Sequence, residues 1–431
     1  MRVNKIKGTL DFFGQDALDY RYIEHTARKI SEHFGYQEMI VPIFEATEVF
    51  ERSVGETSDI VNKEMYTFVD RGKRSITLRP EGTAGITRSF VENKLYVELG
   101  LSKISYFGPM FRYERPQAGR LRQFTQFGIE TFGAETPLLD ADIINLSFHI
   151  LKALGITKIK VLVNTIGSET ARKDYALALK SHFETSLPSL CSDCQNRFIH
   201  NPLRMLDCKV DQELDIMKTA PKIWDYLAED DRQYFNNLLN YLDALNIPYE
   251  ISDRLVRGLD YYTNTVFELI YDDESSLLHN LALSAGGRYN SLAKDFDGPQ
   301  TPAIGFAMGI ERLMMIRKEL GLITPQKENK RIVIITLGEK MKLDGLRLAN
   351  FLRNHGLIVD LDYQNHHLKP QFKLANRFKA RYLIIMGEDE KNKNVVKIKD
   401  AINGTEEVIT LKQVSEFFKI EGEEYAYLQK Q

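Results

Sequence analysis

The chain has 431 residues, of which 43% are hydrophobic and 27% are charged, so it is longer than a single domain and is neither low-complexity nor disordered. Its three cysteines exclude a disulfide framework, and because no apolar run approaches ~18 residues and the N-terminus has no hydrophobic signal core, we expect a cytoplasmic protein without a membrane anchor. The net charge of −3 divides into −7 for residues 1–325 and +4 for residues 326–431. This difference indicates a polyanionic partner for the C-terminal part, and the alternative is ordinary scatter in composition.

Residues 16–34 are predicted to form an amphipathic helix, followed by Gly35 where a C-cap glycine belongs. The helical spacing is that of Leu18, Tyr22, Ile23, Ala27, Ile30 and Phe34. Strand-like runs follow at residues 38–41, 65–69 and 75–78. Because Asp70-Arg71-Gly72 is rich in turn residues, we expect the last two runs to form a hairpin.

Further strands are predicted along the body of the chain without regular alternation with helices. They lie at residues 103–114, 122–132, 261–271 and 281–285. This pattern predicts an α+β body around a mainly antiparallel sheet flanked by helices. Residues 166–246 are helical in pattern and polar, and they hold the only Trp and all three Cys, so we interpret them as an inserted helical subdomain.

The pattern changes after a polar linker at residues 324–330. Short apolar strands at residues 331–335, 357–361 and 382–386 alternate with helices around residues 346–352 and 372–378. Such alternation is typical of a mainly parallel sheet covered on both faces. We therefore predict two domains: a body of residues 1–325, interrupted by the insertion, and a C-terminal α/β domain of residues 326–431 with a mixed sheet.

The first candidate for chemistry is the predicted hairpin of residues 111–124. The sequence contains neither a P-loop nor a G-x-G-x-x-G turn, so any bound nucleotide must be held by other groups. The hairpin carries Arg112, Arg115, Arg120 and Arg122. Guanidinium groups grip phosphate in a planar, bidentate way. The alternative is a solvated hairpin held by ion pairs.

The strand that follows this loop has two distinct faces. Its period of two places Phe127 and Ile129 on a core face, and Gln126 and Glu130 on the opposite face. Gly128 lies between the two polar side chains and is expected to leave a gap there. A gap edged by an amide and a carboxylate indicates a small-molecule pocket.

Three later segments have a similar character. Residues 257–263 combine an arginine, a carboxylate and two tyrosines, and residues 284–289 contain paired glycines that permit close approach of a ligand. Residues 303–313 run from a strand into a helix whose start holds Arg312. Each segment also has a purely structural interpretation, as a tight turn or as close packing.

Taken together, these segments resemble the class II aminoacyl-tRNA synthetases over essentially the whole chain. Residues 111–124 are similar to motif 2 of that class and residues 305–312 to motif 3. The helix that leads to Val41-Pro42 is similar to motif 1, whose proline lies at a dimer interface in the family. The resemblance implies the class II fold and a homodimer.

Within that class the chain resembles the histidyl-tRNA synthetase family. Residues 255–262 and 285–289 are similar to its two histidine-specific signatures, and residues 78–83 to its amino-acid loop. The resemblance implies a ligase that activates L-histidine with ATP to histidyl-AMP and transfers the histidine to the 3′ end of tRNA(His). It also implies that residues 326–431 bind the anticodon.

The resemblance further implies which residues form the site, with Arg112 and Arg257 as catalytic groups. Histidine would be bound by Glu81, Thr83, Arg112, Gln126, Glu130, Arg257, Tyr261 and Tyr262. ATP would be bound by Arg112, Glu114, Arg120, Phe124 and Arg312. Mg²⁺ would enter with ATP and neutralise the leaving pyrophosphate. The carboxylate of Glu130 would select histidine, because it accepts the N–H groups of an imidazole ring.

Contacts to tRNA are expected on both domains. The candidates in the motif 2 loop are Arg115 and Gln117, and those in the C-terminal domain, spaced along one predicted helix, are Lys369, Lys373, Arg377 and Lys379. The alternative for the second group is a solvated helix face.

Two other functions remain open from the sequence. One is a catalytically inactive, synthetase-like regulatory subunit of histidine biosynthesis, and the other is a synthetase for threonine or proline. The intact residues 257–262 and the presence of a C-terminal domain argue against the first. Neither threonine nor proline has a side-chain N–H group for Glu130 and Tyr261, which argues against the second.

The cysteines of the insertion have two interpretations. Cys191, Cys194, His200 and Cys208 are four soft ligands of the kind that zinc requires. However, the second half of the set lacks a paired spacing, and the family resemblance implies no metal. Reduced, inert thiols are the alternative, and no metal site is expected.

Overall fold

The computed structural model describes residues 3–54, 60–98, 100–256, 261–324, 331–364 and 366–420. The chain divides into two compact units, Met1–Thr324 and Pro325–Gln431. Among the described helices, none has both the length and the apolar character needed to span a membrane.

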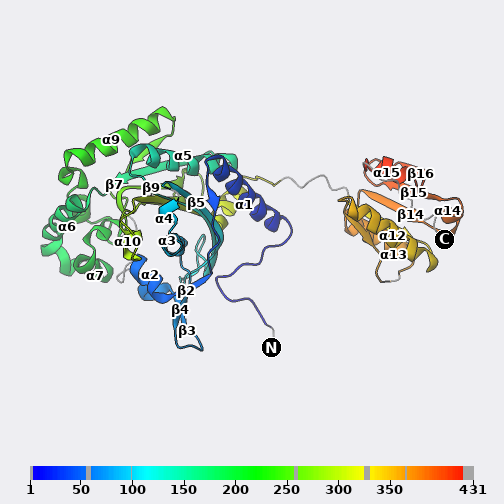
Figure 1. Ribbon diagram of the computed structural model, residues 1–431, viewed down its shortest axis with the longest axis horizontal. Coiled ribbons are helices and arrows are strands. Elements are labelled where there is room, and N and C mark those ends of the chain that lie inside the picture. Colours follow the sequence, from blue (N-terminus) through cyan, green and yellow to red (C-terminus); the bar gives the residue numbers. More distant parts are fainter. Residues whose placement is uncertain are drawn as a thin grey trace. The chain divides into compact units, whose positions relative to one another are not determined.

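The first unit is built on an eight-stranded sheet of order β1-β5-β6-β11-β10-β9-β7-β8 (Figure 1). In chain order its strands are β1 (Gln37–Glu38), β5 (Ser102–Phe111), β6 (Gln123–Phe132), β7 (Ile159–Thr165), β8 (Tyr249–Ile251), β9 (Thr263–Tyr271), β10 (Ala282–Arg288) and β11 (Ala303–Gly309). Only the edge pairs β1–β5 and β7–β8 are parallel. The predicted mainly antiparallel sheet is confirmed, with strand bounds that differ from the predicted ones by up to three residues.

One face of this sheet is covered by three helices and forms the main core. They are α1 (Gln15–His33), α5 (Pro137–Ala153) and α11 (Ile310–Glu319). The apolar stripe of α1 buries Ile23 and Ala27 in the same cluster as Phe127 and Ile129 of β6. Gly35 follows α1 with a φ of +81°, a left-handed conformation that glycine adopts without steric cost. The predicted helix and the predicted core face of β6 are both confirmed.

The opposite face of the sheet carries the second core of this unit. Its helices are α3 (Thr83–Glu92), α4 (Leu95–Glu98) and α10 (Leu292–Asp295), and α2 (Thr47–Val54) packs on α3 through a separate small cluster of Val49, Phe50 and Ala84. Ile86 and Phe90 of α3 pack there with Ile104 and Tyr106 of β5. A small sheet of order β2-β4-β3 joins this side, and the predicted hairpin is its pair β3–β4. Its strands are β2 (Phe44–Ala46), β3 (Tyr66–Val69) and β4 (Ser75–Leu78), and a π-helical turn, η1 (Ile60–Glu64), precedes β3.

The insertion is helical, as predicted. Its elements are α6 (Glu169–Phe183), η2 (Glu184–Ser189), α7 (Ser192–His200), η3 (Pro202–Asp207), α8 (Asp215–Lys218), η4 (Ile223–Tyr226) and α9 (Glu229–Ala244). The elements from α6 to η4 share a small core of their own, whereas Phe235, Leu238 and Leu242 of α9 are buried in the main core. Figure 1 shows α9 beside α5 and the smaller helices at the edge of the unit. By its packing, α9 thus belongs with the body.

The second unit contains a five-stranded mixed sheet of order β13-β12-β14-β15-β16. Its strands are β12 (Ile332–Thr336), β13 (Val359–Leu361), β14 (Tyr382–Met386), β15 (Val395–Asp400) and β16 (Glu406–Thr410), and its helices are α12 (Lys340–Asn354), α13 (Leu368–Arg377), α14 (Glu388–Asn392) and α15 (Gln413–Phe417). Strands β13, β12 and β14 are parallel and the last two are antiparallel. The predicted α/β unit with a mixed sheet is confirmed.

Candidate active site

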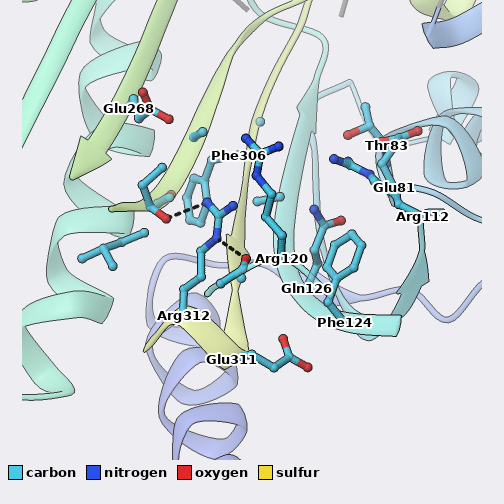
Figure 2. Close-up of a pocket in the computed structure, with 18 of the residues that line it drawn as sticks. Glu81, Thr83, Arg112, Arg120, Phe124, Gln126, Glu268, Phe306, Glu311 and Arg312 are labelled. Carbon is cyan, nitrogen blue, oxygen red and sulfur yellow. Dashed lines mark hydrogen bonds between the residues drawn. The ribbon is translucent and has the colours of Figure 1, made fainter. Parts of the chain in front are cut away.

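A pocket opens on the face of β5 and β6 that lies opposite the main core. It is lined by side chains from β5, β6, the hairpin between them, the start of α3, and strands β9 to β11. Figure 2 shows Glu81, Thr83 and Arg112 at one side of the view and Glu268 and Arg312 at the other, with Arg120 and Gln126 between them. The pocket therefore brings together segments that are more than 200 residues apart in sequence.

Glu130 and Gln126 line this pocket as predicted, but the gap between them is filled. A Cβ atom at Gly128 would lie 2.2 Å from Cζ of Tyr106, so the glycine makes room for that ring rather than for a ligand. A Cβ at Gly305, the β11 residue paired with Glu130, would lie 1.9 Å from Oε2 of Glu130. The glycine of β11 is therefore what allows the Glu130 carboxylate to fit.

The Glu130 carboxylate is fully buried and held at both oxygens. The Thr83 hydroxyl donates to Oε1 at 2.6 Å, and the Tyr289 hydroxyl donates to Oε2. Nearby, Glu81 accepts the backbone N–H groups of Thr83 at 2.6 Å and Ala84 at 2.9 Å. Those N–H groups belong to the first turn of α3, where the helix dipole favours a carboxylate. The two carboxylates are thus positioned by their hydrogen bonds before any ligand binds.

Gln126 offers an unused acceptor in this pocket. Its Oε1 atom is buried, and no described residue provides it with a hydrogen-bond partner. A buried amide oxygen without a partner costs free energy, which a bound ligand with a donor would recover. This favours Gln126 as a ligand-binding group.

Three tyrosine rings form the wall beside the carboxylates. Tyr261 lies 4.7 Å from Tyr262 and 5.4 Å from Tyr289, measured between ring centroids, and all three line the pocket. The paired glycines of β10 were expected to admit a ligand. Instead, a Cβ at Gly286 would lie 2.1 Å from the carbonyl oxygen of Gly305, and one at Gly287 would lie 2.8 Å from Cδ1 of Tyr262. Both glycines allow close packing, which is the structural interpretation that the sequence left open.

The four arginines of the hairpin have different environments. Arg112 and Arg120 line the pocket and flank Glu114, with N–O distances of 3.8 and 3.5 Å. Arg112 also donates to the carbonyl oxygen of Pro80 at 2.9 Å and lies over the Phe124 ring at 5.3 Å from its centroid. Glu114 and Phe124 line the pocket as well.

The other two hairpin arginines do not line the pocket. Arg122 packs over the Tyr113 ring, 4.1 Å from its centroid, and Arg115 is exposed. Gln117, in the turn, is also exposed. The hairpin thus contributes two guanidinium groups, not four, to the pocket.

Arg312, at the start of α11, is held rigidly at the far side. Its Nε donates to the carbonyl oxygen of Gly119 at 3.0 Å and its Nη1 to that of Ala282 at 2.9 Å, the two bonds drawn in Figure 2. Burial lowers the pKa of Arg312, and the positive charges of Arg120 and Arg112 lower it further. Three guanidinium groups that repel one another form a site that a polyanion would stabilise.

Some predicted site residues lie elsewhere. Arg257 is outside the described residues. Lys369, Lys373 and Arg377 are exposed along α13, whereas Lys379 lies beyond its end with a φ of +49°. Phe378 is the C-cap of α13, and the left-handed backbone at Lys379 does not continue the helix. The prediction that all four basic residues share one helix is therefore wrong for Lys379.

The structure adds pocket residues that the sequence analysis did not select. They are Tyr106, Glu268, Tyr289, Phe306 and Glu311. Glu311 accepts the backbone N–H of Thr125 at 2.9 Å and so ties α11 to β6. Glu268 is the one charged residue within the apolar run of β9, and this isolated charge was the available signal for it.

Burial raises the pKa of Glu130 to about 8, with the negative charge of Glu81 adding to the effect and hydrogen bonds from Thr83 and Tyr289 opposing it. The folded chain then keeps this proton up to about pH 8, while the unfolded chain releases it near 4.5. The contribution of protonated Glu130 to the free energy of unfolding is therefore fully present below pH 4.5 and is lost as the pH rises through 8.

We therefore expect the melting temperature of the ligand-free protein to fall between about pH 6 and about pH 8.5, with at most about 1.4 kcal/mol of unfolding free energy lost per pH unit. Glu130→Gln, which keeps the size but cannot ionise, should show a smaller fall in thermal melts followed by circular dichroism. Parallel curves for the two proteins would contradict this assignment.

Comparisons with known proteins show the family to which the chain is related. A family profile described as histidyl-tRNA synthetase matches residues 8–313, and one described as an anticodon binding domain matches residues 331–421. A histidine–tRNA ligase of Anoxybacillus flavithermus is 46% identical over 406 residues, which are 94% of this chain and 96% of the relative. Histidine–tRNA ligase 1 of Shouchella clausii is 46% identical over 420 residues, 97% and 98% of the two chains.

A solved structure agrees as well. The crystal structure of apo Staphylococcus aureus histidyl-tRNA synthetase has a TM-score of 0.83 and 39% identity, covering 97% of this chain and 100% of that one. These similarities extend over both units. The chain belongs to the histidyl-tRNA synthetase family.

Proposed function

We propose that the chain is a class II ligase that activates L-histidine with ATP and transfers the histidine to tRNA(His). The observation that carries this proposal is a pocket that holds buried carboxylates and tyrosines at one end and Arg312 at the other, with Arg112 near Glu81 and Arg120 between the two ends. A regulatory subunit without catalysis is not favoured, because relatives named histidine–tRNA ligase match nearly the full chain at 46% identity.

Histidine would occupy the end with the carboxylates. Glu130 would accept an imidazole N–H, and Tyr261 and Tyr262 would contact the ring. Glu81 and Thr83 would bind the α-amino group, and the amide of Gln126 would contact the carboxylate region of histidine. The hydrogen bonds to Glu130 and Glu81 support these roles, because they hold both acceptors in place before histidine enters.

ATP would occupy the end with Arg312. Arg112, Arg120 and Arg312 would contact phosphate oxygens, and Phe124 and Arg312 would lie on either side of the adenine. The reaction also requires a divalent cation, which we propose is Mg²⁺. Glu114 and Glu268 supply carboxylate oxygens of the kind that Mg²⁺ prefers. The negative charge of each also raises the pKa of Arg312. The cation would reduce the charge on the leaving pyrophosphate.

In the first step, a carboxylate oxygen of histidine attacks the α-phosphorus of ATP, and the bond from that phosphorus to the bridging oxygen breaks. Pyrophosphate leaves and histidyl-AMP forms. Arg112 and Arg257 would stabilise the charge that develops at the α-phosphate. In the second step, a hydroxyl of the terminal tRNA ribose loses its proton and attacks the histidyl carbonyl, and AMP leaves.

The function is tested by pyrophosphate exchange with each amino acid separately and by charging of tRNA(His). Histidine alone should support exchange, and the histidine should appear on the tRNA. Exchange with threonine or proline would identify another synthetase. Exchange with none of the amino acids would identify a regulatory subunit.

We propose that residues 1–325 form the catalytic domain and residues 326–431 the anticodon-binding domain. Deleting residues 331–431 should then leave histidine-dependent exchange largely intact, because every residue assigned to that reaction precedes Leu313. Charging of tRNA(His) should fall sharply in kcat as well as KM, since binding at the anticodon also positions the distant ribose. The two assays on the shortened and full-length chains measure this difference.

Paired neutralisation on α13 refines this test. Lys369→Ala with Lys373→Ala should weaken tRNA binding and reduce its salt dependence by about one unit of slope per lost phosphate contact. Arg377 is the third candidate on this exposed face, and Arg115 and Gln117 are candidates near the acceptor end of the tRNA. If the shortened chain still charged tRNA at the full rate, the second unit would have a role other than binding the anticodon.

We propose that the enzyme is a homodimer and acts in the cytoplasm, where tRNA and ATP are available. Ile40 is 85% exposed, and Ile43 and Phe44 are also exposed, beside the Pro42 that motif 1 places at a dimer interface. Ile40→Asp with Phe44→Asp should yield a monomer by light scattering. Leu277→Asp, at a fully exposed apolar residue outside this segment, should remain dimeric. A wild-type monomer would refute the proposal.

A further inference from the structure

Three cysteines and an aspartate of the insertion come together in one cluster. Cys191, Cys194, Cys208 and Asp211 each present a ligand atom, and these atoms all lie within 4.8 Å of one another. Cys194, Cys208 and Asp211 are buried and Cys191 is partly buried. His200, which the sequence analysis grouped with the cysteines, is exposed at the end of α7 and does not belong to this cluster.

The distances within the cluster suit a tetrahedral metal ion. The Sγ atoms of Cys191 and Cys208 lie 3.6 Å apart, and Sγ of Cys208 lies 3.7 Å from Oδ2 of Asp211. Zinc–sulfur bonds of ~2.3 Å and zinc–oxygen bonds of ~2.0 Å at tetrahedral angles place ligand atoms ~3.5–3.8 Å apart. A central zinc ion therefore requires little movement of these side chains.

The chain presents the ligands in two matching turns. Cys191 and Cys194 are separated by two residues, as are Cys208 and Asp211, and 13 residues lie between the pairs. In each turn the second ligand donates its backbone N–H to the sulfur of the first, at 3.5 Å for Cys194 and 3.3 Å for Asp211. Such N–H groups stabilise thiolates, the form that binds metal. The paired spacing was missed in the sequence because its second half ends in Asp rather than Cys.

We infer that Cys191, Cys194, Cys208 and Asp211 form a structural zinc site. Four protein ligands close the coordination sphere, so the site has no open position for a substrate. Three thiolates favour zinc over Mg²⁺ or Ca²⁺, which prefer oxygen ligands. This inference is independent of the histidine and ATP pocket, whose lining includes none of the four residues.

The position of the cluster explains what the ion stabilises. Cys191 caps the N-terminus of α7, and Cys208 and Asp211 follow η3, so the ion joins two segments of the small core between α6 and η4. Four of the six elements from α6 to η4 have six residues or fewer, and a core of this size is marginal by itself. Zinc would supply the missing stability to the insertion.

The test is the zinc content and thermal stability of the full-length protein, purified from zinc-supplemented cells without chelator. We expect about one zinc per chain by mass spectrometry, and three reactive thiols per chain after denaturation with a chelator. Chelation of the native protein should lower the melting temperature, and added zinc should restore it. Cobalt substitution should produce the visible absorption of a tetrahedral site with thiolate ligands.

Variants of the four ligands and of neighbouring residues distinguish a metal site from a chance cluster of thiols. Asp211→Asn keeps the shape of the side chain and should weaken zinc binding at least about tenfold in competition with a chelating dye. Cys208→Ser should lose the ion. Asp193→Asn and His200→Ala, exposed neighbours outside the cluster, should bind zinc like the wild type.

Four results would overturn the inference. One is a protein that, after reconstitution, holds well under one zinc per chain, and another is a protein that holds iron instead. The third is a single reactive thiol per chain, which would indicate a disulfide. The last is Asp211→Asn binding zinc as tightly as Asp193→Asn.

Discussion

Replacing Arg112 by alanine is expected to reduce histidine-dependent pyrophosphate exchange about 10²- to 10³-fold. Its guanidinium group is held by the carbonyl of Pro80, lies near Glu81 of the proposed histidine site and packs over Phe124 of the proposed ATP site, so we expect it to face the α-phosphate. A preoriented cation facing developing charge is worth about 3–4 kcal/mol in the transition state. The loss should therefore appear in kcat as well as in KM for ATP.

Two variants control this result. Arg112→Lys should recover only part of the activity, because an ammonium group lacks the planar fork. Arg122→Ala removes a guanidinium group of the same hairpin that packs on Tyr113, outside the pocket, and should retain near-normal exchange. Equal losses in Arg112→Ala and Arg122→Ala would indicate that the hairpin is only a folded, ion-paired element. Arg257→Ala, suggested by the family resemblance, belongs in the same series.

Replacing Glu130 by glutamine is expected to weaken histidine binding about 10- to 100-fold, with little change in KM for ATP. A hydrogen bond to a charged acceptor contributes about 1.5–3 kcal/mol, and glutamine keeps the shape but not the charge. Because the pKa of Glu130 is about 8, the wild-type carboxyl must release its proton to accept the imidazole N–H. Wild-type affinity should therefore rise from about pH 7 to about pH 8.5, and the variant should not follow.

The measurement is the KM for histidine and for ATP in exchange assays across that pH range, with isothermal titration of histidine as a direct check. Gln126→Leu is a useful companion, since it removes an amide without altering charge and should leave the wild-type pH dependence in place. An unchanged histidine affinity in Glu130→Gln would place imidazole recognition elsewhere in the pocket.

Local patterns in the sequence determined the elements and part of the site. The period of two along residues 122–132 correctly assigned Phe127 and Ile129 to the core and Gln126 and Glu130 to the pocket, because side chains of a strand alternate between faces. Helical spacing identified α1, and the change of pattern after residue 330 identified the α/β unit. These features depend on the backbone geometry of neighbouring residues, so a short stretch of sequence contains them.

Contacts between distant segments were decided only by the tertiary structure. Tyr106 fills the space at Gly128, and Tyr289 donates to Glu130 from 159 residues away. Arg288, within a segment that resembles a histidine signature, is fully buried in an ion pair with Asp140 instead of lining the pocket.

The role of Asp211 in the insertion also depends on a contact between distant segments that the sequence alone does not show. Its spacing from Cys208 is visible in the sequence, yet its meaning depends on the approach of Cys191 and Cys194 from the start of α7. Periodicity states which face a residue occupies. It cannot state which residue of another element fills the space opposite, because that depends on how the elements pack in three dimensions.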